Sequence, residues 1–179
     1  MIRPSRFALG ALLSGAVLAL AAATPAWAAD TPTLLGVSSA WSAFTSGSGS
    51  AKICYAISKP TATSPKAKRD PIYFLITDWP GRRTKSEPEV VPGYQYKDGS
   101  TVTVAVGSDK FELFTKNEDG AGAAWVRQRA DEIRMIETMK RGQQILVTGT
   151  SLRGKLTRDT YSLAGLSDAL DKIHAGCGM

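Results

Sequence analysis

The segment that most resembles a chemical motif is residues 149–155, GTSLRGK. It matches most of the phosphate-binding pattern G-x-x-x-x-G-K-[ST], in which backbone N–H groups hold phosphates and the last hydroxyl binds Mg²⁺. Leu156 occupies the position of that hydroxyl, and the residues after it have strand or turn character rather than a helical pattern. We therefore expect no nucleotide to bind here.

A serine hydrolase site could be assembled from Ser162, His174 and Asp159. His174 is the only histidine of the chain. However, Ser162 is not surrounded by the glycine pattern of a strained nucleophile turn. One histidine and two cysteines also leave too few ligands for a catalytic metal. We expect a non-enzymatic protein without a cofactor or metal; an uncharacterised hydrolase using these three residues is an alternative.

Three polar residues near the end of the chain predict a structural network. Arg153, Asp159 and Tyr161 could form a buried or half-buried cluster that fixes a turn, with neighbouring glycines supplying the backbone conformations that the turn requires. A structural role is favoured over a ligand site.

Basic residues concentrate in the first half of the chain, where few acidic residues accompany them. The candidates for contact with an anion are Lys66, Lys68, Arg69, Arg82 and Arg83. Anionic lipid or glycan, on the envelope or on a host surface, would be the partner, although a solvated pair of loops explains the same pattern. Nucleic acid is not expected, because the nearby Tyr94 and Tyr96 lie among acidic residues.

The two cysteines, Cys54 and Cys177, are the only ones in the chain. In an oxidising compartment an even count without other soft metal ligands favours a disulfide. Two buried free thiols are the alternative. A bond would connect an early strand to the last residues of the chain.

The sequence around these groups predicts mainly strands. Residues 34–44 and 52–57 are β-rich around a Gly/Ser turn and predict a hairpin. Further strands are expected at residues 72–76, 101–106, 110–115, 144–149 and 161–163. Residues 61–70 and 80–92 are rich in Pro, Gly and charge and are predicted to be loops.

Two helices are predicted, at residues 130–141 and 166–174. The first has apolar residues at helical spacing and Gly142 after its last turn. The expected fold is mainly β, a twisted β-sandwich or partly open barrel with one or two short helices.

The N-terminus predicts export. Residues 1–28 combine Arg3 and Arg6, an uncharged apolar run, and an A-x-A cleavage pattern at Ala26 and Ala28. Cleavage would lower the net charge from +6 to +4 by removing two arginines. Residues 29–179 would then form a single domain without an integral membrane segment, located in the periplasm, secreted or on the outer surface.

Several segments together resemble the invasion-associated locus B family of exported alphaproteobacterial proteins. They are Trp41, residues 52–56, 124–125, 139–142, 149–154 and 159–165, and the stretch from Ala169 to Cys177. The resemblance implies a β-rich periplasmic or outer-surface protein without known catalytic residues. Founding members are linked to entry into host cells, so a role in host-cell interaction is expected. An accessory role in envelope assembly or stress tolerance is the alternative.

Overall fold

The computed structural model describes residues 31–69 and 71–179, and the predicted signal peptide lies outside them. The strands of the described residues are β1 (Thr33–Ser38), β2 (Trp41–Ser46), β3 (Ile53–Ser58), β4 (Ala62–Ser64), β5 (Tyr73–Trp79), β6 (Thr84–Val91), β7 (Thr101–Val106), β8 (Asp109–Glu118), β9 (Ala121–Trp125), β10 (Gln144–Thr150) and β11 (Leu156–Ser162). The helices are α1 (Arg129–Arg141) and α2 (Leu166–Cys177), with short 3-10 turns η1 (Gly49–Ala51) and η2 (Pro80–Arg82).

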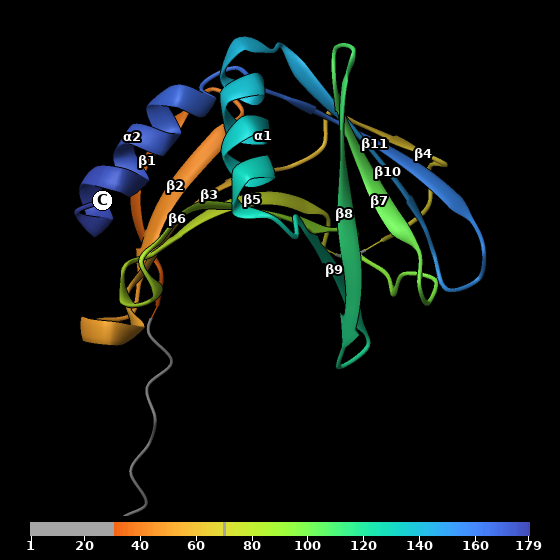
Figure 1. Ribbon diagram of the computed structural model, residues 1–179, viewed down its shortest axis with the longest axis horizontal. Helices are drawn as coiled ribbons and strands as arrows, with labels where there is room; N and C mark the ends of the chain where they lie inside the picture. The colour runs from red at the N-terminus through yellow and green to blue at the C-terminus, as the bar shows by residue number, and fades with distance from the viewer. Residues whose placement is uncertain (1–30, 70) are drawn as a thin grey trace, which may run out of the picture.

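All these strands belong to one antiparallel sheet in the order β1-β2-β3-β5-β6-β9-β8-β7-β10-β11-β4. The sheet bends strongly, so that β7, β8, β10 and β11 stand at a steep angle to β2, β3 and β5 (Figure 1). Strands β1 and β4 form its two edges, and the sheet is not closed into a barrel. The predicted fold class, mainly β with two helices, is confirmed.

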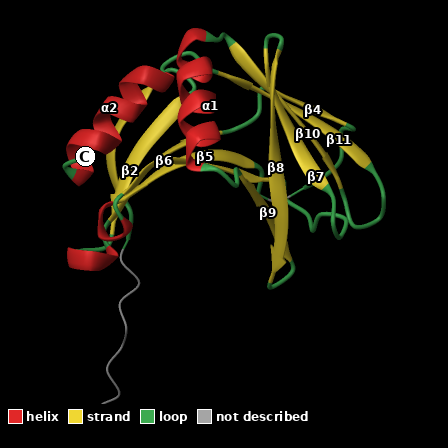
Figure 2. Ribbon diagram, in the orientation of Figure 1, coloured by secondary structure: helices red, strands yellow, loops and turns green. Residues whose placement is uncertain are grey.

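Helix α2 packs on β1, β2, β3 and β5, while α1 packs against β6 and β8 (Figure 2). The apolar side of α1 buries Met135, Ile136 and Met139, as the spacing predicted. Its last turn carries Lys140 and Arg141, whose positive charges are favourable at a helix C-terminus. The helices therefore fill the hollow on one side of the bent sheet.

Hydrogen bonds connect the two halves of the sheet. The indole N–H of Trp41, at the start of β2, donates to the carbonyl of Ser162 at the end of β11 over 3.0 Å. Below this bond, the ring of Phe74 contacts both Trp41 and Tyr161 edge to face, with centroid distances of 6.1 and 5.8 Å. The aromatic cluster and the hydrogen bond hold β11 close to β2 and β5.

Several predicted boundaries were wrong. Residues 80–92 are not one loop, because β6 occupies most of them and alternates buried Ser86, Pro88 and Val90 with the more exposed Glu87 and Glu89. The inward positions carry serine and proline instead of branched apolar residues, which concealed the period of two. The predicted loop at residues 61–70 likewise contains the edge strand β4.

The described residues contain no helix that is both long and apolar enough to cross a membrane.

Candidate functional site

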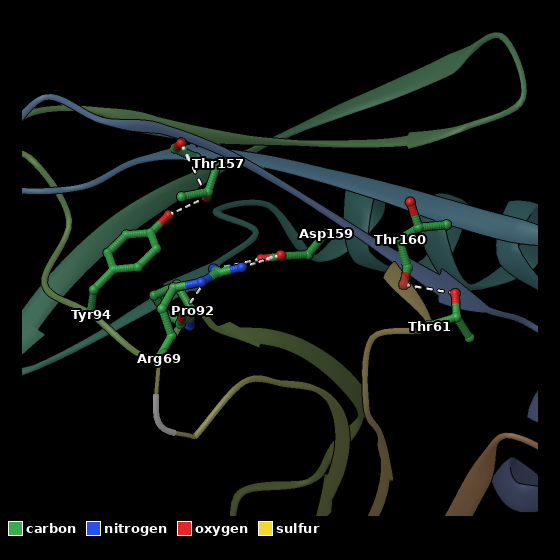
Figure 3. A network of polar contacts seen from close by, with 8 residues as sticks. Thr61, Arg69, Pro92, Tyr94, Thr157, Asp159 and Thr160 are labelled. Atoms are coloured by element: carbon green, nitrogen blue, oxygen red, sulfur yellow. Dashed lines mark hydrogen bonds and ion pairs between the residues drawn. The ribbon is translucent and has the colours of Figure 1, made fainter. Parts of the chain in front are cut away.

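A buried ion pair joins two segments that are far apart in the sequence. Arg69 follows β4, and its Nη1 donates to Oδ2 of Asp159, in β11, over 2.9 Å (Figure 3). Its Nη2 donates to the other carboxylate oxygen, and Nη1 also donates to the carbonyl of Pro92. The two side chains are only 7 % and 4 % exposed. The bidentate geometry therefore fixes the guanidinium in one orientation.

Tyr94 extends this arrangement toward the surface. The guanidinium of Arg69 lies 5.6 Å from the centre of the Tyr94 ring, and the Tyr94 hydroxyl is 2.7 Å from Oγ1 of Thr157. Burial raises the pKa of Tyr94, so the phenol stays neutral. The hydrogen bond to Asp159 raises the pKa of Arg69, so the guanidinium stays charged. The site thus presents a fixed cation beside a neutral aromatic ring.

A pocket of about 390 Å³, here called the β11 pocket, opens beside these residues. Its polar lining consists chiefly of Arg69, Tyr94, Gln95, Arg153, Lys155 and Thr157. Three of these side chains are cationic, and none of the described residues that line the pocket is acidic. Among the described residues, Nε of Arg69 is a buried donor without a hydrogen-bond partner. Arg69 is paired with Asp159, so the charges that the pocket offers to an anion are those of the exposed Arg153 and Lys155.

The opposite end of the molecule is closed by a disulfide between Cys54 in β3 and Cys177 at the end of α2. The Cα atoms lie 5.9 Å apart, and 123 positions separate the two residues in the sequence. Nζ of Lys52 donates to the carbonyl of Gly176 beside it. The predicted pairing of the cysteines is confirmed, and it fixes the C-terminal helix to the sheet.

The family model described as invasion associated locus B (IalB) protein matches residues 41–174, which include the β11 pocket and most of α2. The chain belongs to the IalB family. It is also similar to the crystal structure of invasion associated protein B from Bartonella henselae, with a TM-score of 0.55 and 12 % identity over 80 % of this chain and 98 % of that one. At this identity the likeness shows a shared fold alone. A comparison with curated proteins gives no match.

In this IalB-family chain the predicted network of Arg153, Asp159 and Tyr161 does not form as expected. Arg153 is exposed in the turn between β10 and β11, and Asp159 pairs with Arg69 instead. Asp159 and Tyr161 do share the buried face of β11, because alternate residues of a strand point to the same side. The Tyr161 hydroxyl is buried, and no described residue bonds to it.

The five predicted anion-contacting residues do not gather on one surface. Lys66 and Lys68 are exposed on the segment that leads to Arg69, whereas Arg69 itself is buried. Arg82 and Arg83 lie at the β5–β6 connection, next to η1, at the other end of the molecule (Figure 1). The guanidinium of Arg82 covers the Trp79 ring at 4.4 Å. The cations near the β11 pocket are thus partly different from those predicted.

The alternative hydrolase site of Ser162, Asp159 and His174 is not assembled in the IalB-family fold. Oγ of Ser162 accepts a hydrogen bond from the Ala164 N–H, and Asp159 is bound to Arg69. The His174 ring bonds to Ser86 instead. Residues 149–155 comprise the end of β10 and the turn that leads to β11, without the helix that a phosphate-binding loop requires. The described residues contain no cluster of three or more potential metal ligands from His, Cys, Asp and Glu.

Proposed function

We propose that the mature protein is an exported, non-enzymatic binding protein that holds an anionic glycan in the β11 pocket. The observation that carries this proposal is the pair of exposed cations, Arg153 and Lys155, in a pocket lining free of carboxylates among the described residues. The third cation of the lining, Arg69, is already paired with Asp159. A sugar sulfate or carboxylate accepts charged hydrogen bonds from arginine in the same geometry as Asp159 does. Either the bacterial envelope or a host surface could supply such a glycan.

The shape of the site supports a glycan over a membrane surface. The pocket volume of about 390 Å³ lies near the lower end of ligand pockets, which range from about 300 to 1,000 Å³. Such a hollow suits one or two sugar units, whereas a lipid surface would favour a protruding basic patch. Gln95, Thr157 and the Tyr94 hydroxyl offer neutral polar contacts for sugar hydroxyls.

The proposal of export rests on two features of the chain. Residues 1–28 have the three-part pattern of a cleaved signal peptide. The Cys54–Cys177 disulfide requires an oxidising compartment to persist. Protease treatment of intact cells would separate display on the outer surface, where the protein is digested, from a periplasmic location, where it is protected.

The binding proposal can be tested by calorimetric titration of the mature protein with a heparin-derived tetrasaccharide. The double variant Arg153→Ser/Lys155→Ser should lose at least about tenfold in affinity, because hydrogen bonds to charged groups contribute about 1.5–3 kcal/mol. Arg82→Ser/Arg83→Ser is the matched control, since it removes the same charge at the far end of the molecule. Its affinity should stay within about twofold of the wild type.

Salt and lipid provide two further arms of this experiment. Binding should weaken as salt increases, because exposed charges are screened beyond about 8 Å at physiological ionic strength. Equal losses in the two double variants would mean that net charge alone attracts the glycan, and the pocket proposal would be wrong. Binding to anionic phosphatidylglycerol vesicles but not to the tetrasaccharide would assign the ligand to lipid and also overturn the proposal.

A further inference from the structure

A second pocket, here called the helix pocket, lies between α1, α2 and β6 and has a volume of about 310 Å³. Ile133 and Ile136 of α1 and Leu170 of α2 form its apolar walls. Ile133 is 52 % exposed, which leaves apolar surface uncovered at the mouth. The cationic side chains of Lys85, Arg129 and Lys140 also line it. The carboxylates of Glu137 and Asp171 line it as well, so the helix pocket combines apolar walls with three cations and two carboxylates.

The deep end of the helix pocket contains the only histidine of the chain. Nε2 of His174 is 2.9 Å from Oγ of Ser86 and 3.8 Å from Oδ1 of Asp78. The Ser86 N–H donates to the same Asp78 oxygen over 2.8 Å. Asp78 is completely buried, and no described residue bonds to its Oδ2. A buried carboxylate with an unused acceptor therefore lies directly behind the histidine.

The backbone at this point is strained. Ser86 has φ of +57°, in the left-handed region that residues other than glycine rarely adopt. The pairing of β5 with β6 is also shifted between Thr77 and Trp79, the neighbours of Asp78. Strained residues of this kind cluster at functional sites, where the surrounding structure maintains them. Here the strain places Ser86 between Asp78 and His174.

We propose that the helix pocket binds a small amphiphilic carboxylate with a short apolar chain, and that His174 takes up a proton when the carboxylate binds. Lys85 supplies the charge for the head group, together with Arg129, which also pairs with Glu132 over 2.7 Å. Ile133, Ile136 and Leu170 contact the chain. The pocket is at the lower end of the size range of ligand sites, which excludes a long-chain lipid.

The coupling to a proton follows from the charges that face His174. Burial is the largest influence and lowers the pKa of His174. Asp78 and Asp171 favour the protonated form of His174, whereas Lys85 and Lys140 oppose it. Glu137 also lines the pocket and pairs with Lys140 over 3.2 Å. A bound carboxylate adds one negative charge near the imidazole, which raises the histidine pKa. By linkage, protonation must strengthen carboxylate binding by the same factor.

Octanoate is a suitable probe for titrating the mature protein. Calorimetry in two buffers of different ionisation enthalpy should show proton uptake, and the affinity should increase at least fivefold between pH 7.5 and 5.5. The single histidine gives one pair of imidazole C–H signals in NMR spectra, and the apparent pKa of His174 measured from them should increase in the presence of octanoate. Octanamide, which has the same chain without charge, should bind at least tenfold more weakly.

Variants separate the two parts of the proposal. Lys85→Ser should weaken octanoate binding at least threefold, while the matched variant Lys110→Ser, on the exposed surface of β8, should not. His174→Gln should retain binding at pH 7.5 but lose the pH dependence. Absence of octanoate binding at millimolar concentration, equal binding of octanamide, or unchanged pH dependence in His174→Gln would each overturn the inference. Thermal denaturation of each variant checks that it is folded.

Discussion

Replacing Arg69 by methionine should strongly destabilise the folded protein. The substitution keeps an apolar side chain close in length to the aliphatic part of arginine but leaves the carboxylate of Asp159 buried without its cation. The Asp159 side chain is 4 % exposed, so water cannot replace the lost partner. Breaking a buried ion pair in this way costs about 3–5 kcal/mol.

The expected loss of stability in Arg69→Met is large enough to measure by thermal and by urea denaturation. In a domain of the size of residues 29–179, 1 kcal/mol changes the melting temperature by about 2–4 °C, so Arg69→Met should melt roughly 6–20 °C below the wild type. Urea denaturation followed by circular dichroism would measure the free energy of unfolding directly. The matched variant Lys68→Met, one residue earlier and exposed, should stay within about 0.5 kcal/mol of the wild type.

A double-mutant cycle provides the decisive control. Arg69→Met/Asp159→Leu removes both charges and should recover most of the lost stability, because an apolar pair of similar volume often replaces a buried ion pair at little cost. If Arg69→Met costs less than about 1 kcal/mol, or if the double variant is as unstable as the sum of the single ones, the ion pair does not hold β11 to the segment after β4.

Three further predictions concern other parts of the molecule. Cys54→Ser should cost about 4–5 kcal/mol, since the disulfide closes a loop of 123 residues, and reduction of the wild type should lower its melting temperature by a similar amount. Gly165→Ala should destabilise the folded protein by at least about 2 kcal/mol in urea denaturation, because φ is +85° and a Cβ would clash with the Ser38 carbonyl. The control Gly154→Ala, where φ is +77° and the Cβ would meet open space, should cost about 1 kcal/mol. His174 should make the free energy of unfolding decrease from pH 7 to pH 5, because burial lowers its pKa and the unfolded chain therefore binds this proton first. Burial raises the pKa of Asp78 and of Glu89, which acts in the opposite direction, so the comparison is made with a variant that lacks the histidine. His174→Gln should show a smaller decrease over that pH range, and an equal decrease would contradict the assignment.

Periodic patterns carried most of the fold prediction. The alternation in residues 101–106 and 110–115 correctly predicted the β7–β8 hairpin, and helical spacing correctly predicted α1. The N-terminal hairpin was predicted only in part, because residues 34–44 contain both β1 and β2 with a turn at Ser39. Short turns formed by non-glycine residues with positive φ leave little trace in composition.

The site was harder to predict because its partners are distant in the sequence. Asp159 was expected in a network with Arg153 and Tyr161 that fixes a turn, whereas it lies on the buried face of β11 and pairs with Arg69. Arg153, six residues earlier, was the nearest candidate, but the hairpin turn carries it into solvent. Arg69 is 90 positions away, and only the path of the segment between β4 and β5 brings it to β11. The signal for Ser86 was equally weak, because β6 was not recognised as a strand. Asp78 was missed because the strand predicted at residues 72–76 ended before it, whereas β5 extends to Trp79.

The most direct test of the binding proposal is an NMR titration of the ¹⁵N-labelled mature protein with the heparin-derived tetrasaccharide. The account predicts that the amide signals that shift belong to residues 67–69, 94–95 and 151–157, which border the β11 pocket. Shifts concentrated at Arg82 and Arg83, or spread evenly over the exposed lysines and arginines, would contradict it.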